Sequence, residues 1–131
     1  MRSSEPLVLT LDVGTSSVRT LLFDAQGCEV QGFGVQLPYQ VVTTADGGVE
    51  ADADELCELV VRSFCGIHTQ MKTSGRRPAA VASCTFWHNV LGVGEDGCPT
   101  TPVIHLFDTR SAGAAKRLAE RIDDRRQHAR T

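Results

Sequence analysis

One short stretch gives the first indication of the fold: LDVGTSS, at residues 11–17. Residues 7–13 alternate between apolar and mixed positions, which is the period of a β-strand with one buried face. A second strand is predicted from Ser17 to Phe23, and the turn DAQG at residues 24–27 closes it. The two strands therefore form a hairpin whose turn carries a carboxylate, a glycine and three hydroxyl groups.

The turn of this hairpin has the composition of a phosphate-binding loop. Its glycine allows the backbone to approach a ligand closely, and its N–H groups and hydroxyls can converge on phosphate oxygens. The carboxylate would repel a bare phosphate, so it needs a cation between them, and Mg²⁺ takes one or two carboxylates while keeping several waters. The candidate binding residues are Asp12, Gly14, Thr15, Ser16 and Ser17, with Asp12 also the candidate metal ligand. Alternatively, Asp12 caps a turn and the hydroxyls are simply solvated.

The remaining patterns predict a mixed α/β structure of element order β-β-β-α-β-β-β-α. A third strand at residues 28–36 completes an antiparallel meander, and residues 37–48 form a loop. A helix then begins with Asp52 as N-cap and Glu55 three residues later, which is a capping-box arrangement. Its apolar positions repeat at intervals of three and four residues as far as Met71, so one stripe of the helix is expected to be buried.

The second half of the chain predicts three more strands and a second helix. Residues 79–84 form a buried strand that crosses over to join the sheet, and short strands are expected at residues 89–93 and 102–107. An amphipathic, strongly charged helix is expected from Ser111 to about residue 126.

Composition excludes several classes of function. The chain has 131 residues and a formal net charge of −3, so nothing global favours nucleic acid or an anionic membrane. Apolar runs are strand-sized, and the N-terminus carries no signal-peptide pattern, so we expect a cytoplasmic protein without a membrane partner. Arginines of the second helix alternate with acidic residues, which indicates a solvated face rather than a nucleic-acid site; they are Arg117, Arg121, Arg125, Arg126 and Arg130.

Five cysteines are widely spaced and contain no C-x-x-C pair. Neither a disulfide framework nor a structural zinc site fits this spacing. We expect reduced thiols, several of them packed as small hydrophobic side chains. They are Cys28, Cys57, Cys65, Cys84 and Cys98.

Several motifs in succession resemble known kinases. Residues 9–27 resemble the first phosphate motif of the actin-like ATPase superfamily, which includes sugar kinases. Later segments resemble the FGGY carbohydrate kinases in the family's own order; they are GVEAD at 48–52, TFWHNVLGV at 85–93, DGCP at 96–99, PVI at 102–104 and DTRS at 108–111. The resemblance covers most of the chain, from about Leu7 to Ser111.

This resemblance implies an incomplete actin-like ATPase (ribonuclease H-like) lobe, with residues 1–131 as part of a kinase N-terminal domain. Within it, the phosphate hairpin spans about 7–27, the sugar-loop region about 79–111 and the charged C-terminal helix about 111–127. The implied cofactors are ATP and Mg²⁺, and the implied substrate is a small sugar or polyol.

Residue roles also follow from the resemblance. Asp12 would lie in the Mg²⁺ shell, and Thr15 and Ser16 would face the β- and γ-phosphates. Trp87 and His88 match the loop that touches the sugar, where an aromatic face covers sugar carbons and a polar group binds hydroxyls. From the residues alone, Trp87 could instead fill the core and His88 could be a buried, hydrogen-bonded histidine.

Asp108 and Arg110 are further candidate substrate-binding residues, since they fall between a strand and a helix, where ligand sites of α/β folds lie. The alternative is a helix cap, from Asp108 or Ser111, beside an exposed arginine. Here the chain departs from the family, which usually has Trp two residues before the Asp. This chain has Leu106 there, flanked by His105 and Phe107, which are also atypical.

In these kinases the general-base Asp, the second phosphate motif and the adenosine-binding segment lie downstream, and no residue here matches the base. We therefore expect no catalytic residue in this chain and no activity from it alone. One hypothesis is an N-terminal fragment of a carbohydrate kinase that self-associates or pairs with the missing lobe. The alternative is a stand-alone, non-catalytic sugar-binding or regulatory module that pairs with a partner chain.

Overall fold

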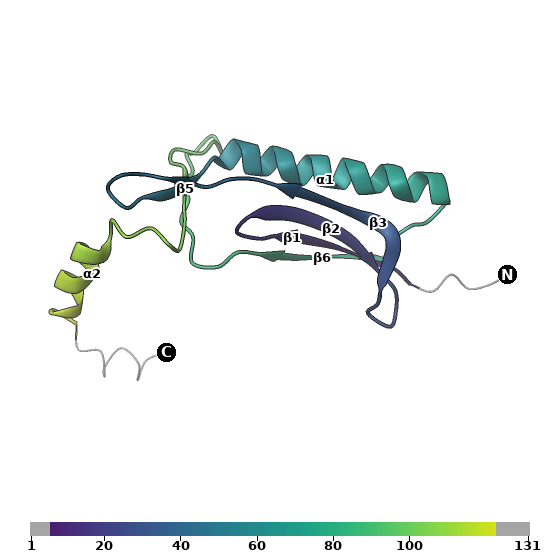
Figure 1. The fold of residues 1–131 in the computed structure, drawn as a ribbon, viewed down its shortest axis with the longest axis horizontal. Helices are drawn as coiled ribbons and strands as arrows, with labels where there is room; N and C mark the ends of the chain where they lie inside the picture. Colours follow the sequence, from purple (N-terminus) through teal and green to yellow (C-terminus); the bar gives the residue numbers. More distant parts are fainter. Residues whose placement is uncertain (1–5, 123–131) are drawn as a thin grey trace.

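The computed structural model describes residues 6–122. A mixed sheet and one long helix form the body, and a smaller sheet and a short helix lie at one end (Figure 1). In chain order the elements are β1 (Val8–Val13), β2 (Ser17–Phe23), β3 (Glu29–Pro38), β4 (Val42–Thr43), β5 (Val49–Ala51), α1 (Ala53–Ser74), β6 (Ala80–Thr85), β7 (Val103–Ile104) and α2 (Ala112–Ala119).

The larger sheet has the strand order β3-β2-β1-β6. β1, β2 and β3 form the expected antiparallel meander. After α1 the chain crosses over, and β6 pairs with β1 in parallel, from Val8↔Ala80 to Val13↔Thr85. The predicted meander and crossover are therefore confirmed, and α1 lies along one face of this sheet (Figure 1).

Local sequence signals set both ends of α1. The Asp52 carboxylate accepts hydrogen bonds from the backbone N–H groups of Asp54 and Glu55, at 2.9 and 3.0 Å. Gly75 ends the helix in the left-handed region, at φ 68°, which glycine adopts without steric cost. The Arg76 N–H then donates to the Met71 carbonyl, which closes the last turn.

The predicted apolar stripe of α1 packs against the sheet in two clusters. At one end Leu9 and Leu22 meet Ile67 and Met71. The other cluster lies near the carboxyl ends of β1 and β6 and contains Val13, Val18, Tyr39, Ala51, Leu56, Leu59 and Val103. The interior thus lies between α1 and one face of the larger sheet, and at one end the smaller sheet adds Ala51 and Val103.

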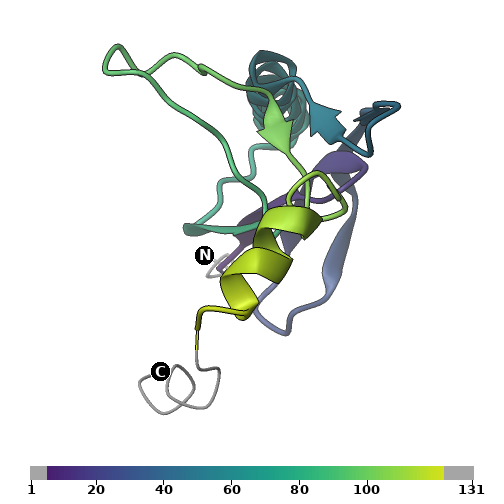
Figure 2. The ribbon, with the colours of Figure 1, turned by 90° about the vertical axis from the view of Figure 1, so that its left-hand side faces the viewer.

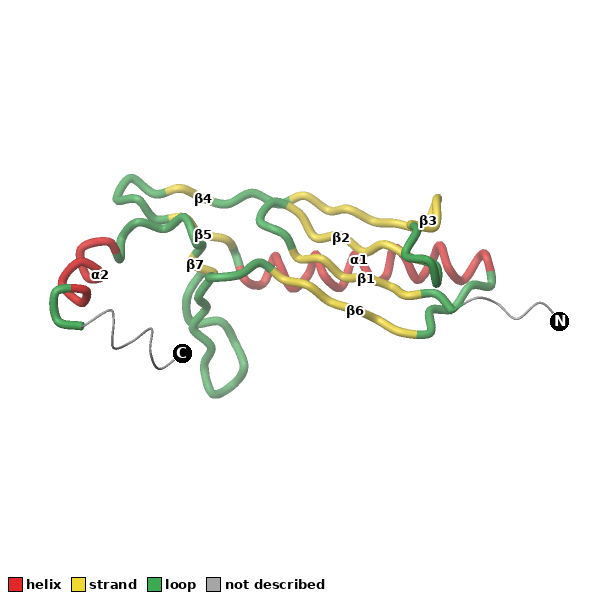
Figure 3. Tube along the Cα trace, turned by 90° about the horizontal axis from the view of Figure 1, so that it is seen from below, coloured by secondary structure: helices red, strands yellow, loops and turns green. Residues whose placement is uncertain are grey.

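The smaller sheet, β4-β5-β7, is antiparallel and lies beyond the carboxyl ends of β1 and β6 (Figure 3). Its β5 pairs with β7 through Glu50↔Ile104 and Ala51↔Val103. β4 falls in the segment expected to be a loop, so that prediction was wrong there. The last predicted strand is shorter than expected, because only residues 103–104 pair.

No strand forms at residues 89–93, so that prediction was wrong. Val90 and Val93 make only isolated bridges, to Ile104 and Pro99. The reason is a glycine-containing hairpin, in which Gly94 N–H donates to the Cys98 carbonyl at 2.9 Å. Alternating apolar residues in this segment belong to a projecting loop, not to a sheet.

Two predictions of burial were also wrong. All six residues of β6 are exposed, because β6 forms an edge of the sheet and no described element lies beside its outer side. All five cysteines are exposed free thiols rather than core side chains.

α2 begins as expected near Ser111, but the Ser111 side chain makes no capping hydrogen bond. The described helix is eight residues long and buries none of them, and Figure 2 shows it at the near end of the molecule. The helix ends at Ala119, so the prediction that it continues was wrong for residues 120–122; the remainder, to about residue 126, lies outside the described residues. Among residues 6–122, no helix is both long and apolar enough to span a membrane.

Candidate functional site

The parallel pairing of β1 and β6 brings the two predicted ligand regions to one end of the sheet. Val13 lies opposite Thr85, and the Phe86 N–H donates to the Val13 carbonyl at 2.9 Å. The hairpin turn and the loop carrying Trp87 and His88 therefore leave adjacent strands at their carboxyl ends. This is the usual position of ligand sites in open α/β sheets.

The hairpin turn is held by a residue that the sequence analysis missed. The Tyr39 hydroxyl donates to the Gly14 carbonyl at 2.6 Å, and the Tyr39 N–H donates to the Ser16 carbonyl at 3.1 Å. Burial raises the pKa of Tyr39 above its usual 10, so the phenol stays a donor. Thr15 and Ser16 are left exposed at the tip of the turn. Tyr39 lies in a segment read as a loop, and no local motif marks it.

Ser17 lies differently from the other two hydroxyl residues. It is buried, and its hydroxyl oxygen accepts a hydrogen bond from the Gln36 side-chain amide of β3 at 3.3 Å. The exposed hydroxyl groups of the turn are therefore those of Thr15 and Ser16.

Asp12 is paired rather than packed into the core. Leu9 and Val13 face α1, so by strand alternation Asp12 lies on the opposite face of the sheet. There its Oδ2 accepts from Arg19 Nη2 at 2.5 Å and from Arg19 Nε at 3.1 Å, and 36% of its side chain is exposed.

The donor set fits Mg²⁺ only as a partial site. Within residues 6–122, no group of three or more His, Cys, Asp or Glu side chains could hold a metal ion by itself. One accessible carboxylate beside a turn with free hydroxyls suits an ion whose other ligands are waters and phosphate oxygens. Arg19 would have to share Asp12 with that ion.

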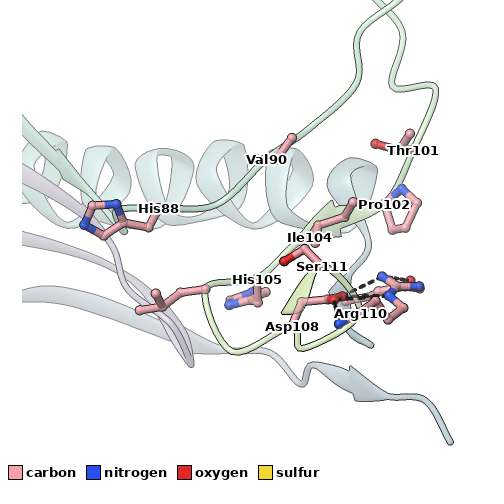
Figure 4. A pocket seen from close by; sticks show the side chains of 11 residues that line it. His88, Val90, Thr101, Pro102, Ile104, His105, Asp108, Arg110 and Ser111 are labelled. Atoms are coloured by element: carbon pink, nitrogen blue, oxygen red, sulfur yellow. Dashed lines mark hydrogen bonds and ion pairs between the residues drawn. The ribbon is translucent and has the colours of Figure 1, made fainter. Parts of the chain in front are cut away.

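A cavity of about 540 Å³ lies beyond the sheet end, next to the smaller sheet. Its size is in the range of small-molecule sites. Figure 4 shows His88 at one end, Asp108 with Arg110 at the other, and the His105 ring between them. The lining residues are Glu50, His88, Val90, Thr101, Pro102, Ile104, His105, Leu106, Asp108, Arg110 and Ser111.

A charged clamp forms one end of this cavity. Arg110 Nη2 binds Asp108 Oδ2 at 2.6 Å and Glu50 Oε1 at 2.7 Å, so it bridges the loop after β7 to β5. The hydrogen bond from the Arg110 side chain is the main reason that the pKa of Asp108 is lowered to about 2. Glu50 was missed as a site residue, although it lies in the 48–52 motif.

Gly48 gives the Arg110 side chain the space to form this clamp. Gly48 is buried, and a Cβ added to it would lie 2.8 Å from the Arg110 guanidinium carbon. A side chain here would displace the Arg110 guanidinium from its present position, so the glycine two residues before Glu50 has a structural reason.

Trp87 and His88 are both exposed, so the alternatives that place them in the core were wrong. Trp87 is 76% exposed, and the two rings lie edge to face with centroids 6.0 Å apart. His88 has φ 62°, in the left-handed region that a non-glycine residue adopts at a cost. Such strain is often found at functional positions. His88 lines the cavity, whereas Trp87 stands beside it.

Two buried polar atoms near the cavity lack a partner: His105 Nε2 and Asn89 Nδ2. His105 is only 3% exposed, and its ring centroid lies 5.4 Å from that of Phe86. Burial lowers the pKa of His105 below its usual 6.5, which favours the neutral imidazole. The Asn89 Oδ1 accepts from the Leu106 N–H at 2.7 Å, in the peptide that His105 begins. A buried, unpartnered polar group costs about 1–3 kcal/mol, so both atoms require an explanation.

Comparison with solved structures identifies the fold. A xylulose kinase from Rhodospirillum rubrum superposes with a TM-score of 0.82 at 20% identity, covering 91% of this chain and 24% of that one. A gluconate kinase from Lactobacillus acidophilus gives 0.77 at 22% identity, covering 90% and 23%. The fold is therefore that of sugar kinases with the actin-like ATPase fold.

The sequence identifies the family. The N-terminal domain of the FGGY family of carbohydrate kinases matches residues 7–131, and the chain belongs to this family. Gluconokinases from Bacillus licheniformis and Bacillus subtilis (strain 168) are each 27% identical over 124 residues, which is 95% of this chain. An erythritol kinase from Brucella abortus (strain 2308) is 25% identical over 119 residues, 91% of this chain. The chain spans only 22–23% of the length of these relatives.

Proposed function

We propose that this chain forms one wall of an ATP-dependent carbohydrate kinase, which transfers the γ-phosphate of ATP to a hydroxyl group of a sugar or polyol. In this proposal the cavity beside His88 holds the acceptor, and the hairpin turn faces the phosphates. One observation carries the proposal: the parallel register of Val13 with Thr85, which aligns both regions at the same end of the sheet.

Each site residue has a distinct role in this proposal. The Thr15 and Ser16 hydroxyls and nearby N–H groups bind phosphate oxygens, and Gly14 continues the turn. Asp12 would hold Mg²⁺, which neutralises phosphate charge when it is bound. These roles are supported by the exposure of the turn and by its anchoring through Tyr39.

The part of the site that would bind the sugar or polyol combines exposed side chains with an ion-paired wall. His88 presents its ring to the cavity, and Trp87 offers an apolar face for sugar carbons. Asp108 and Arg110 shape the opposite end through their clamp with Glu50. The Arg110 guanidinium already donates to the carboxylates of Glu50 and Asp108. We therefore assign Arg110 mainly to positioning these two side chains rather than to binding the acceptor.

We assign no catalytic residue to this chain. A general base would have to lie within hydrogen-bond reach of the attacking hydroxyl, and Asp108, the cavity carboxylate nearest that role, is already bound to Arg110 and the Val49 N–H. We expect the isolated chain to bind ligands weakly and to transfer no phosphate. Its five free thiols suit a reducing compartment, and we place the protein in the cytoplasm.

Titration calorimetry tests this function. We expect Mg·ATP to bind the full 131-residue chain, with Asp12→Asn reducing the dependence of ATP affinity on Mg²⁺. Asp46→Asn, in an exposed turn, serves as the matched control. Absence of binding by Mg·ATP and by every sugar, polyol and sugar acid tested would contradict the proposal.

A stand-alone binding module is the second candidate, favoured by a cavity of about 540 Å³ with an ion-paired wall. A coupled assay of ADP release distinguishes the two. The kinase hypothesis predicts that a supplied polypeptide carrying the rest of a family member restores activity, whereas the module hypothesis predicts millimolar or tighter sugar binding with no such rescue.

A further inference from the structure

We propose that the cavity beside His88 is built for an uncharged polyhydroxy compound rather than a sugar acid, and that His105 binds one of its hydroxyl groups through Nε2. This inference rests on the proposed function and narrows its substrate class. It assigns a specificity-determining role to a residue that no motif indicated.

The charge of the cavity is the first argument. Its ionic lining groups are Glu50, Asp108 and Arg110, which sum to −1 when the histidines are neutral. Arg110 is the single lining cation among the described residues, and both carboxylates already bind it, at 2.6 and 2.7 Å. A substrate carboxylate would lose its hydration beside a net negative wall and find no cation left to pair with it.

The apolar part of the lining is the second argument. Val90, Ile104 and Leu106 face the same cavity as the clamp. Sugars and polyols present carbon-bound hydrogens between their hydroxyl groups, and these pack on aliphatic surfaces. An aliphatic surface beside the neutral polar groups of Thr101 and Ser111 suits a neutral chain of hydroxyl-bearing carbons.

His105 supplies the third argument. It is buried, it lines the cavity, and its Nε2 has no protein partner. Its backbone is fixed on both sides, because its N–H donates to the Val49 carbonyl and its carbonyl accepts from the Asp108 N–H, each at 2.9 Å. The Phe86 ring lies against the imidazole, and Asn89 holds the peptide that follows. An imidazole fixed in this way can donate to or accept from a hydroxyl group.

A matched pair of ligands tests the charge preference. D-Glucitol and D-gluconate share the configuration of their carbon chain and differ only at carbon 1, which is a hydroxymethyl group in one and a carboxylate in the other. The chain has a single tryptophan, Trp87, so its fluorescence reports binding at this loop. We expect D-glucitol to bind at least about tenfold more tightly than D-gluconate. Glu50→Gln, which removes one negative charge, should narrow this ratio.

A variant pair tests His105. His105→Phe keeps a planar aromatic ring but removes Nε2, and we expect it to weaken D-glucitol binding about tenfold without lowering the urea midpoint of unfolding. His68→Phe, on the exposed side of α1, is the control and should change neither.

The outcomes separate this inference from the proposed function. Equal or tighter binding of D-gluconate overturns the charge argument, and unchanged D-glucitol affinity in His105→Phe overturns the role of His105; in both cases the proposed function stands. If neither ligand, nor any other sugar, polyol or sugar acid, changes the Trp87 signal or releases heat, the proposed function and this inference fail together.

Discussion

At the residue scale, two histidines of one cavity experience opposite environments. His88 is exposed and strained, whereas His105 is buried and has a nitrogen without a partner. Both features cost folding free energy. We interpret the strained backbone of His88 and the unpartnered nitrogen of His105 as features that serve ligand binding at a cost in stability. Each leads to a measurable prediction.

Replacing His88 by glycine should stabilise the fold while harming the site. Glycine adopts φ 62° freely, so we expect His88→Gly to raise the free energy of unfolding by up to about 1 kcal/mol. Sugar binding should weaken, because the ring is lost. Urea denaturation and Trp87 fluorescence measure the two effects; a destabilised variant would contradict the strain argument.

The pKa of His105 gives a pH prediction. Its folded pKa lies below the usual 6.5, so at pH values between the two the unfolded chain binds the proton first. Stability attributable to this group is therefore full above about pH 6.5, declines as the pH falls and levels off below the folded pKa. We expect His105→Phe to lose less stability than the parent between pH 7.5 and 5. Parallel curves for the two proteins would show that His105 is not buried as a neutral group.

At the element scale, α1 is the element whose ends and buried face are best defined by sequence signals. It also covers the buried face of the larger sheet. Its buried stripe contributes Ile67 and Met71 to one core cluster and Leu56 and Leu59 to the other, and its start is set by a single side chain. The segment before it also carries Glu50, which binds Arg110, and Gly48, which leaves space for the Arg110 side chain. Fraying of the first helical turn would therefore loosen the cavity as well as the core.

Removing the α1 N-cap should have a defined cost. Asp52→Ala leaves the N–H groups of Asp54 and Glu55 without their acceptor, and we expect a loss of about 1 kcal/mol in the free energy of unfolding. Asp52→Asn keeps an oxygen acceptor and should recover most of that loss. Equal destabilisation by both substitutions would mean that the charge, rather than the hydrogen bonds, matters.

At the scale of the whole molecule, the described sheet is covered on one face by α1 and is open along β6. The six residues AVASCT of β6 are all exposed and carry neither a charge nor a proline, the usual protections of an edge strand. Among them is a large apolar side chain, that of Val81, which is 59% exposed. A strand of this kind readily pairs with another chain.

We therefore expect the isolated chain to self-associate in a concentration-dependent manner. Val81→Lys places a charge on the edge and should shift the chain toward monomer in sedimentation velocity, with little change in stability. Val61→Lys, on the exposed side of α1, is the matched control. A parent chain that remains monomeric at high concentration would contradict this prediction.

Local elements of the fold could be predicted from the sequence, whereas contacts between distant segments could not. Alternation of apolar residues in β1 and β2 and the capping signals of α1 are local, so the meander and the helix were predicted correctly. The segment at residues 89–93 has the same alternation but belongs to a loop, because the hairpin turn that follows it, with Gly94 and Gly97, replaces pairing with a sheet. The burial of β6 was predicted from an apolar run, and a run cannot reveal whether a neighbouring element covers it.

The sequence by itself determined the family, the meander, α1 and the identity of the loop that carries Trp87 and His88, since each of these depends on residues close together in the chain. Only the tertiary structure decided that Glu50 and Asp108 share Arg110, that Tyr39 holds the hairpin turn and that His105 lines the cavity. These contacts join segments separated by tens of residues, and their formation depends on strand register and on space that no local pattern encodes.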